Sequence, residues 1–105
     1  MSETYNLDMQ KIADTLEFDL EDVEMLVGVF LSTANDSLVE LKRSIELNDK
    51  ESIMRIAHSI KGSAANLTLI DISEVAKEIE TGARSSLELN YEEKYNNLEK
   101  LIKSI

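Results

Sequence analysis

Apolar residues recur at intervals of three and four positions along most of the chain and do not alternate with polar ones. Such spacing places the apolar side chains on one face of an α-helix, so the pattern predicts helices. The chain has no proline and only three glycines, which leaves few residues that would end a helix. We therefore predict an all-α protein.

The same pattern divides the chain into five expected helices. Polar residues mark several starts, with Asp19 and Asp49 as N-caps and with Thr68 opening a capping-box pattern that ends at Asp71. The short interval between the third and fourth helices favours an antiparallel pair. We predict an up-and-down antiparallel four-helix bundle with a short extra N-terminal helix. The expected helices run from about Leu7 to Leu16, Asp19 to Leu47, Asp49 to Asn66, Thr68 to Ala83 and Tyr91 to Ile105.

Each helix carries a stripe of residues that should face the core. The stripes include Val23, Phe30, Ala34, Leu38, Leu41 and Ile45 on the second helix, Ile53, Ile56, Ala57, Ile60, Ala64 and Leu67 on the third, and Ile72, Val75, Ala76, Ile79 and Ala83 on the fourth. These residues predict one continuous core.

The composition indicates one domain without disulfides. A chain of 105 residues, 43% of them apolar, can form one core, so we predict a single domain over residues 1–105. Cysteine is absent, which suits a reducing cytosol. The start from Met1 to Thr4 lacks the basic and apolar parts of a signal peptide, and no apolar run is long enough to span a bilayer. We expect a monomer in the cytoplasm that does not bind membranes.

The charge is strongly acidic and unevenly distributed. A net charge of −10 argues against binding to nucleic acid or anionic lipid, because their phosphates would be repelled. A well-solvated surface would explain the acidity by itself. However, the 19 residues from Ser52 to Ile70 contain no Asp or Glu, whereas the cations Arg55 and Lys61 lie inside this segment. The segment is therefore a candidate site for an anion.

His58, the only histidine, lies in this segment. On a helical projection it falls about 140° from the centre of the apolar stripe, so its ring is expected to face outward. An outward histidine is often just a polar surface residue, but its neighbours form an unusual set. The residues expected around it are Met54, Arg55, Lys61, Gly62 and Ala65.

These neighbours suit a reaction with a phosphoryl group. An imidazole is a nucleophile when one ring nitrogen is unprotonated, and Lys61 at i+3 is placed to offset the charge of an acquired phosphate. Gly62 costs about 1 kcal/mol of helix stability relative to alanine, which a need for open space beside His58 would explain. The alternatives are a tolerated glycine or a close helix contact for Gly62, a solvated lysine for Lys61, and an ion pair with Glu51 for Arg55.

Glu80 is a further candidate, found by counting across the hairpin between the third and fourth helices. If the turn centres near Leu69, His58 and Glu80 lie at similar heights on neighbouring helices. A carboxylate there can accept a hydrogen bond from one ring nitrogen and leave the other free to attack. An exposed glutamate without this role is an equal alternative on the sequence alone.

The segment Ala57-His58-Ser59-Ile60-Lys61-Gly62-Ser63-Ala64-Ala65-Asn66-Leu67 resembles the signature of histidine-containing phosphotransfer (HPt) domains, which pass phosphoryl groups between proteins in two-component phosphorelays. The resemblance implies that His58 accepts phosphate on Nε2, that Lys61 assists at the phosphate, and that Gly62 leaves room for a partner. It also implies that a polar residue at the position of Glu80 orients the imidazole. The family often has glycine where this chain has Thr68, which leaves the shape of that turn in doubt.

The resemblance also predicts partners and cofactors. The partners would be response-regulator receiver domains and a histidine kinase or hybrid kinase, with Met54, Arg55, Gly62 and Ala65 as the docking surface around His58. An aspartate and a Mg²⁺ ion on the receiver domain would complete the transfer, so we expect no cofactor or metal bound stably to this chain. We predict a phosphocarrier and not an enzyme.

Other functions fit the sequence less well. The chain lacks a glycine-rich nucleotide loop, which excludes a complete histidine kinase, although a phosphoacceptor domain of a larger kinase remains an option. One histidine without cysteine gives no ligand spacing for a metal site. The main alternative is a helical adaptor that binds a signalling partner without carrying phosphate.

Overall fold

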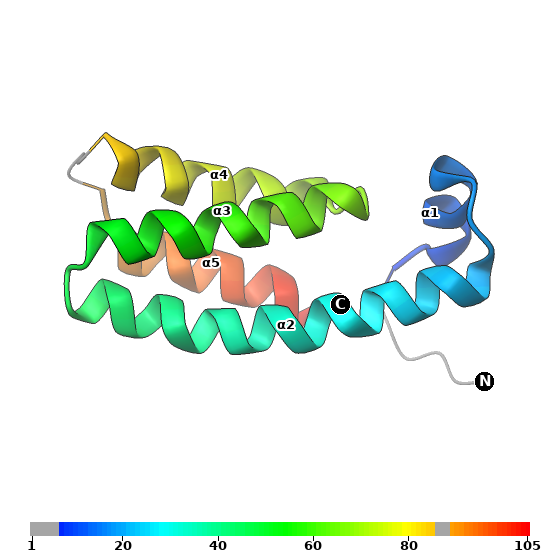
Figure 1. Cartoon of the computed structure of the whole chain (residues 1–105), viewed down its shortest axis with the longest axis horizontal. Helices are drawn as coiled ribbons and strands as arrows, with labels where there is room; N and C mark the ends of the chain where they lie inside the picture. The colour runs from blue at the N-terminus through cyan, green and yellow to red at the C-terminus, as the bar shows by residue number, and fades with distance from the viewer. Residues whose placement is uncertain (1–6, 86–88) are drawn as a thin grey trace.

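The computed structural model describes residues 7–85 and 89–105 (Figure 1). Within these ranges the chain forms α-helices and no strand, which confirms the all-α prediction there. The sequence predicted no signal peptide from the residues Met1 to Thr4, which lie outside the described residues. The single domain over residues 1–105 stays a prediction. The helices are α1 (Met9–Leu16), α2 (Leu20–Glu46), α3 (Lys50–Asn66), α4 (Ile70–Arg84) and α5 (Tyr91–Lys103).

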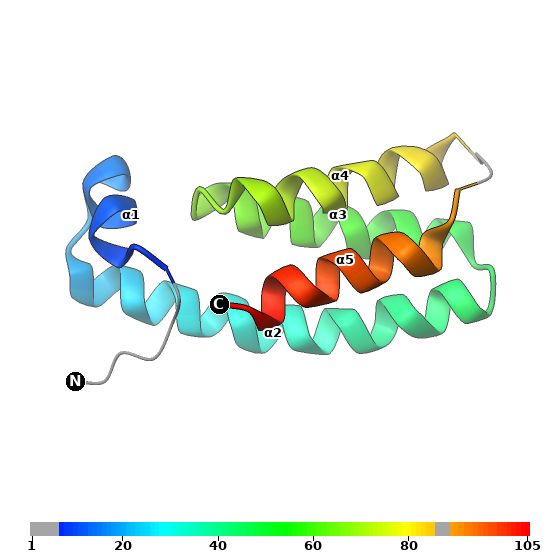
Figure 2. The same ribbon diagram turned by 180° about the vertical axis from the view of Figure 1, so that it is seen from behind.

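The helices pack lengthwise into a bundle (Figures 1 and 2). Helix α3 contacts α2 and α4, and α5 contacts α4 and α2, so these four elements enclose a shared core. Helix α2, with 27 residues, is the longest, and its first turns extend beyond the other three. Helix α1 packs against this extension of α2. The closest pairing is between α3 and α4, the two helices that carry His58 and Glu80.

Most of the predicted stripes are buried. All six stripe residues of α3 and of the loop after it are buried, so the opposite face of α3 is the one left open. Two stripe residues differ, because Ile45 and Val75 are only half-buried. Ser44 is buried beside Ile45, and its hydroxyl donates a hydrogen bond to the backbone oxygen of Glu40 at 3.0 Å. That bond satisfies the polar group, which allows a serine at this core position.

The helix caps agree with the sequence at Asp49 but not at Thr68. Asp49 accepts a hydrogen bond from the Ser52 backbone N–H at 3.2 Å and caps α3 as expected. Asp19 occupies the N-cap position of α2, yet its side chain makes no capping bond.

The prediction that Thr68 caps α4 is wrong, because the N-cap residue is Leu69. Thr68 instead ends α3: its N–H donates to the backbone oxygen of Ala65 at 3.0 Å, and that of Leu69 donates to Ala64 at 2.9 Å. This turn gives Thr68 a left-handed backbone with φ of 60°. Such a conformation costs a residue with a Cβ about 1–2 kcal/mol, and glycine adopts it freely.

Candidate functional site

His58 lies on the open face of α3. Its side chain is 65% exposed, whereas the preceding residues Ile56 and Ala57 are buried in the core. The outward orientation expected from the projection is therefore present. The ring is therefore open to solvent in the folded bundle.

Glu80 lies directly beneath the ring. It projects from α4 toward α3, its side chain is only 2% exposed, and its Oε2 lies 2.8 Å from His58 Nδ1. It is buried because it follows Ile79 and lies one turn after Ala76, two residues by which α4 packs into the core. Ser73 adds a second polar contact between the helices, since its hydroxyl donates to the backbone oxygen of Lys61 at 3.2 Å. The interface thus fixes His58 and Glu80 relative to each other.

Two cations complete the cluster around Glu80. Lys61 Nζ lies 2.7 Å from Oε1, and Arg84 Nη2 lies 2.6 Å from Oε2. One carboxylate therefore faces two cations, so the cluster has one positive charge in excess when the imidazole is neutral. This excess lies beside an exposed ring in a chain whose net charge is −10. Electrostatically, the site suits an incoming anion.

The sequence reasoning placed Lys61 at the phosphate and missed Arg84. In the structure, Lys61 contacts Glu80, on the side of the imidazole ring that carries Nδ1. Arg84 follows Glu80 by four residues on α4, and this spacing alone places the two side chains on the same face of a helix. That spacing was the available signal for Arg84.

The cluster sets the charge of Glu80 and the tautomer of His58. The hydrogen bond from Lys61 lowers the pKa of Glu80 below its ordinary value, burial opposes this, and the hydrogen bond from His58 lowers the pKa further. An ionised carboxylate has no proton to donate, so Nδ1 must carry the proton of their hydrogen bond. In the neutral ring, Nε2 then holds a free lone pair. The exposed imidazole is prepared to act as a nucleophile.

Gly62 has no side chain and Ala65 has only a methyl group, so little projects from the surface beside His58. Both residues are exposed, and a Cβ built at Gly62 would meet no atom within 4 Å. A close helix contact therefore does not explain this glycine. Arg55 is exposed and Met54 is half-buried on the same helix. Within residues 7–85 and 89–105, Arg55 forms no ion pair with Glu51, so that alternative is not supported.

In the comparison with protein families, residues 25–104 match the model of the Hpt domain. The chain belongs to the Hpt domain family. Hpt domains act in phosphotransfer in two-component signalling, as phosphocarriers without kinase activity, and interact in general with response regulators and kinases. Comparisons with curated proteins and with solved structures gave no match. None of the described helices is long and apolar enough to cross a bilayer.

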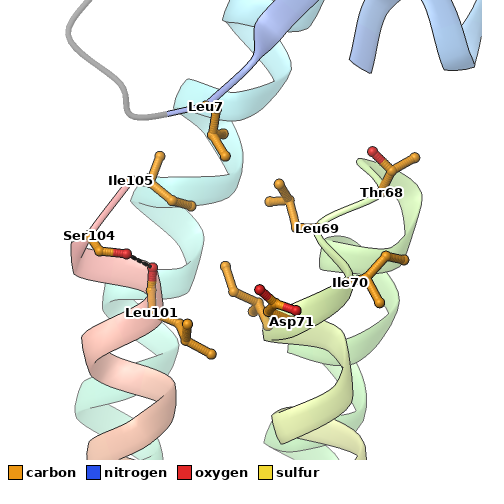
Figure 3. Close-up of a pocket in the computed structure, with 9 residues that line it drawn as sticks. Leu7, Thr68, Leu69, Ile70, Asp71, Leu101, Ser104 and Ile105 are labelled. Atoms are coloured by element: carbon orange, nitrogen blue, oxygen red, sulfur yellow. Dashed lines mark hydrogen bonds between the residues drawn. The ribbon is translucent and has the colours of Figure 1, made fainter. Parts of the chain in front are cut away.

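This Hpt domain also has a cavity at one end of the bundle, but His58 does not line it. The cavity has a volume of about 380 Å³ and lies between the turn before α4 and the end of α5 (Figure 3). Beside it the Ser104 hydroxyl donates to the backbone oxygen of Leu101 at 2.8 Å. Its lining is mainly apolar and includes one carboxylate, Asp71. His58 and its contact with Glu80 therefore lie on the open face of α3, outside this cavity.

Glu80 links the stability of the Hpt domain to pH. Because the pKa of Glu80 is lowered in the folded state, its ion pairs contribute stability that is complete above the ordinary value of 4.5 and is lost as pH falls through the folded pKa. Glu80→Gln should therefore be less stable than the original domain at neutral pH, and this difference should shrink below about pH 4.5. Urea unfolding at several pH values measures it.

Glu78→Gln is the matched control for this prediction. Glu78 lies on the same helix and pairs with Lys94 at 2.9 Å, but its side chain is 54% exposed. Exposed ion pairs contribute about 0–1 kcal/mol, so this variant should unfold much like the original domain at neutral pH. An equal loss of stability in both variants would contradict the special status of Glu80.

Proposed function

We propose that this Hpt domain accepts a phosphoryl group on Nε2 of His58 and passes it to or from the aspartate of a response-regulator receiver domain. The observation that carries the proposal is the contact of Nδ1 with the buried Glu80 carboxylate at 2.8 Å. It leaves Nε2 as the nitrogen with a free lone pair on a ring that is 65% exposed. A phosphorelay intermediate needs this combination of a prepared nucleophile and an open approach.

The transfer needs no other group from this chain as nucleophile or leaving group. Nε2 attacks the phosphorus of an aspartyl phosphate, the P–N bond forms as the P–O bond to the aspartate breaks, and the aspartate leaves as a carboxylate. The imidazole becomes positively charged while Nδ1 keeps its proton, and the Glu80 carboxylate stabilises that charge. The reverse step regenerates the neutral ring and the aspartyl phosphate.

A Mg²⁺ ion on the receiver domain would supply charge compensation for the phosphoryl oxygens. We propose that this Hpt domain binds no stable cofactor of its own during transfer. We further propose a cytoplasmic monomer whose partners are receiver domains and a histidine kinase or hybrid kinase.

The docking surface that we propose surrounds His58 on α3. It consists of Met54, Arg55, Gly62 and Ala65, all of which are exposed or half-buried. Gly62 and Ala65 add little side-chain volume to this surface, and Arg55 adds a cation. We infer an up-and-down antiparallel order for α2 to α5, which is supported by the short connections and by the contacts between successive helices.

Incubation with a purified receiver domain that carries labelled phosphate on its aspartate tests the proposal. The label should move to the Hpt domain, raise its mass by one phosphoryl group, and be stable in base but labile in acid. A non-phosphorylated adaptor would bind the receiver domain without gaining mass. Binding without transfer, in the presence of Mg²⁺, would contradict the proposal and favour the adaptor.

Lys61→Ala should slow the transfer without unfolding the domain. Charge-assisted hydrogen bonds contribute about 1.5–3 kcal/mol, which corresponds to a rate loss of roughly tenfold to a hundredfold if Lys61 contacts the phosphoryl group in the transition state. Stopped transfer reactions measure the rate, and circular dichroism checks the fold. An unchanged rate would show that Lys61 has no part in the transfer.

A further inference from the structure

The Glu80 carboxylate contacts more positive charge than its own charge requires. Lys61 lies 2.7 Å from one oxygen, and Arg84 lies 2.6 Å from the other. His58 Nδ1 shares the second oxygen at 2.8 Å. A buried carboxylate needs a paired cation, and one cation neutralises it. The second cation is therefore available for another anion.

A phosphoryl group on Nε2 of His58 would be that other anion. Lys61 lies one helical turn after His58 on α3, and its ammonium is a compact charge on a flexible stem. Arg84 lies one turn after Glu80 on α4, and its planar guanidinium suits a carboxylate. With two anions present, both are compensated when Lys61 moves to the phosphoryl group and Arg84 stays on Glu80.

We infer, on the basis of the proposed function, that Arg84 is a positioning residue that holds Glu80 in its contact with His58 Nδ1 when Lys61 leaves Glu80 for the phosphoryl group. Arg84 acts through Glu80 and does not touch the phosphate. It keeps the carboxylate ionised and in place, so Nδ1 stays protonated throughout the transfer. No bond is formed or broken at Arg84.

The tautomer of the neutral imidazole tests this inference without any phosphate. Because His58 is the only histidine, NMR of the labelled imidazole nitrogens reports this ring alone. Lys61→Ala reproduces the departure of Lys61, and it should keep Nδ1 protonated because Arg84 still holds Glu80. The double variant Lys61→Ala, Arg84→Gln should lose this preference, and Lys61→Ala, Arg84→Lys should restore it.

Lys77→Gln in the Lys61→Ala background is the matched control. It removes one positive charge from the same helix, at an exposed residue, and should leave the tautomer unchanged. Loss of the Nδ1 proton in Lys61→Ala alone would overturn the inference. So would its retention in the double variant with Arg84→Gln, or a failure of Arg84→Lys to restore it.

Transfer rates provide a second readout. Arg84→Gln should slow phosphoryl transfer about tenfold in the original domain and at least as much in the Lys61→Ala background, because Glu80 then has no cation that holds it beside Nδ1. An effect of less than about twofold in the Lys61→Ala background would show that Arg84 does not hold Glu80 there and would overturn the inference. If the original domain accepts no phosphate, the proposed function fails, whereas the tautomer measurement still decides the role of Arg84.

Discussion

His58→Gln is expected to abolish phosphorylation of the domain. Glutamine keeps a polar side chain at a surface position, but its amide nitrogen has no lone pair that can attack phosphorus. The ring is 65% exposed, so the fold should survive the change. Loss of a covalent nucleophile commonly lowers rates by roughly 10³-fold or more, which would leave no measurable acid-labile phosphate on the variant.

Two controls make the His58→Gln result decisive. Thermal unfolding should give a midpoint close to that of the original domain, since Glu80 keeps its ion pairs with Lys61 and Arg84. Ser59→Ala, at an exposed position on the same helix, should accept phosphate at the normal rate. Phosphate that remains on His58→Gln in an acid-labile form would place the acceptor elsewhere.

Gly62→Gln is expected to slow transfer strongly while leaving the bundle folded. A Cβ at this position meets no atom of the domain within 4 Å, so a longer side chain would project into the space where a receiver domain must approach His58. Replacing glycine in a helix also adds stability, by about 1 kcal/mol for alanine. A more stable but less active variant is therefore expected, with transfer reduced roughly tenfold or more if the obstruction costs about 1.4 kcal/mol.

Gly62→Ala is the graded control for this steric argument. Its single methyl group should raise the unfolding temperature as much as Gly62→Gln does. It should slow transfer far less than Gly62→Gln. Rates of transfer from a phosphorylated receiver domain and thermal unfolding of both variants separate the two effects. Normal transfer by Gly62→Gln would show that the partner does not approach over this residue.

The exposed face of α3 was predicted correctly, because the periodicity of one helix is enough to distinguish its buried face from its exposed face. The buried stripe with Ile53, Ala57 and Ile60 defines one face, and His58 necessarily falls on the other. The exposure of Gly62 and Ala65 follows from the same projection. No knowledge of the neighbouring helices is needed for these residues.

Contacts between helices were harder to predict. Glu80 was expected at the height of His58, with an exposed glutamate as an equal alternative, yet its side chain is 2% exposed and meets His58, Lys61 and Arg84. Its depth depends on how closely α3 and α4 pack, which the periodicity of either helix does not reveal. Arg84 was missed for the same reason, because its importance comes from the burial of Glu80.

The turn between α3 and α4 misled the sequence reasoning at Thr68. A threonine followed three residues later by an aspartate matches a capping box, but the backbone uses Thr68 to close α3 with φ of 60°. Closing hydrogen bonds to Ala64 and Ala65 outweigh the side-chain cap that Thr68 would have made. A capping pattern in the sequence is thus less reliable where one turn must both end a helix and begin the next.

The most direct test of the account is NMR of the phosphorylated domain with labelled imidazole nitrogens. Its single histidine makes the assignment unambiguous. The account predicts that phosphorus is bonded to Nε2 of His58 and that Nδ1 still carries a proton in its hydrogen bond to Glu80. Phosphorus on Nδ1, or a phosphorylated domain whose imidazole is unmodified, would contradict it.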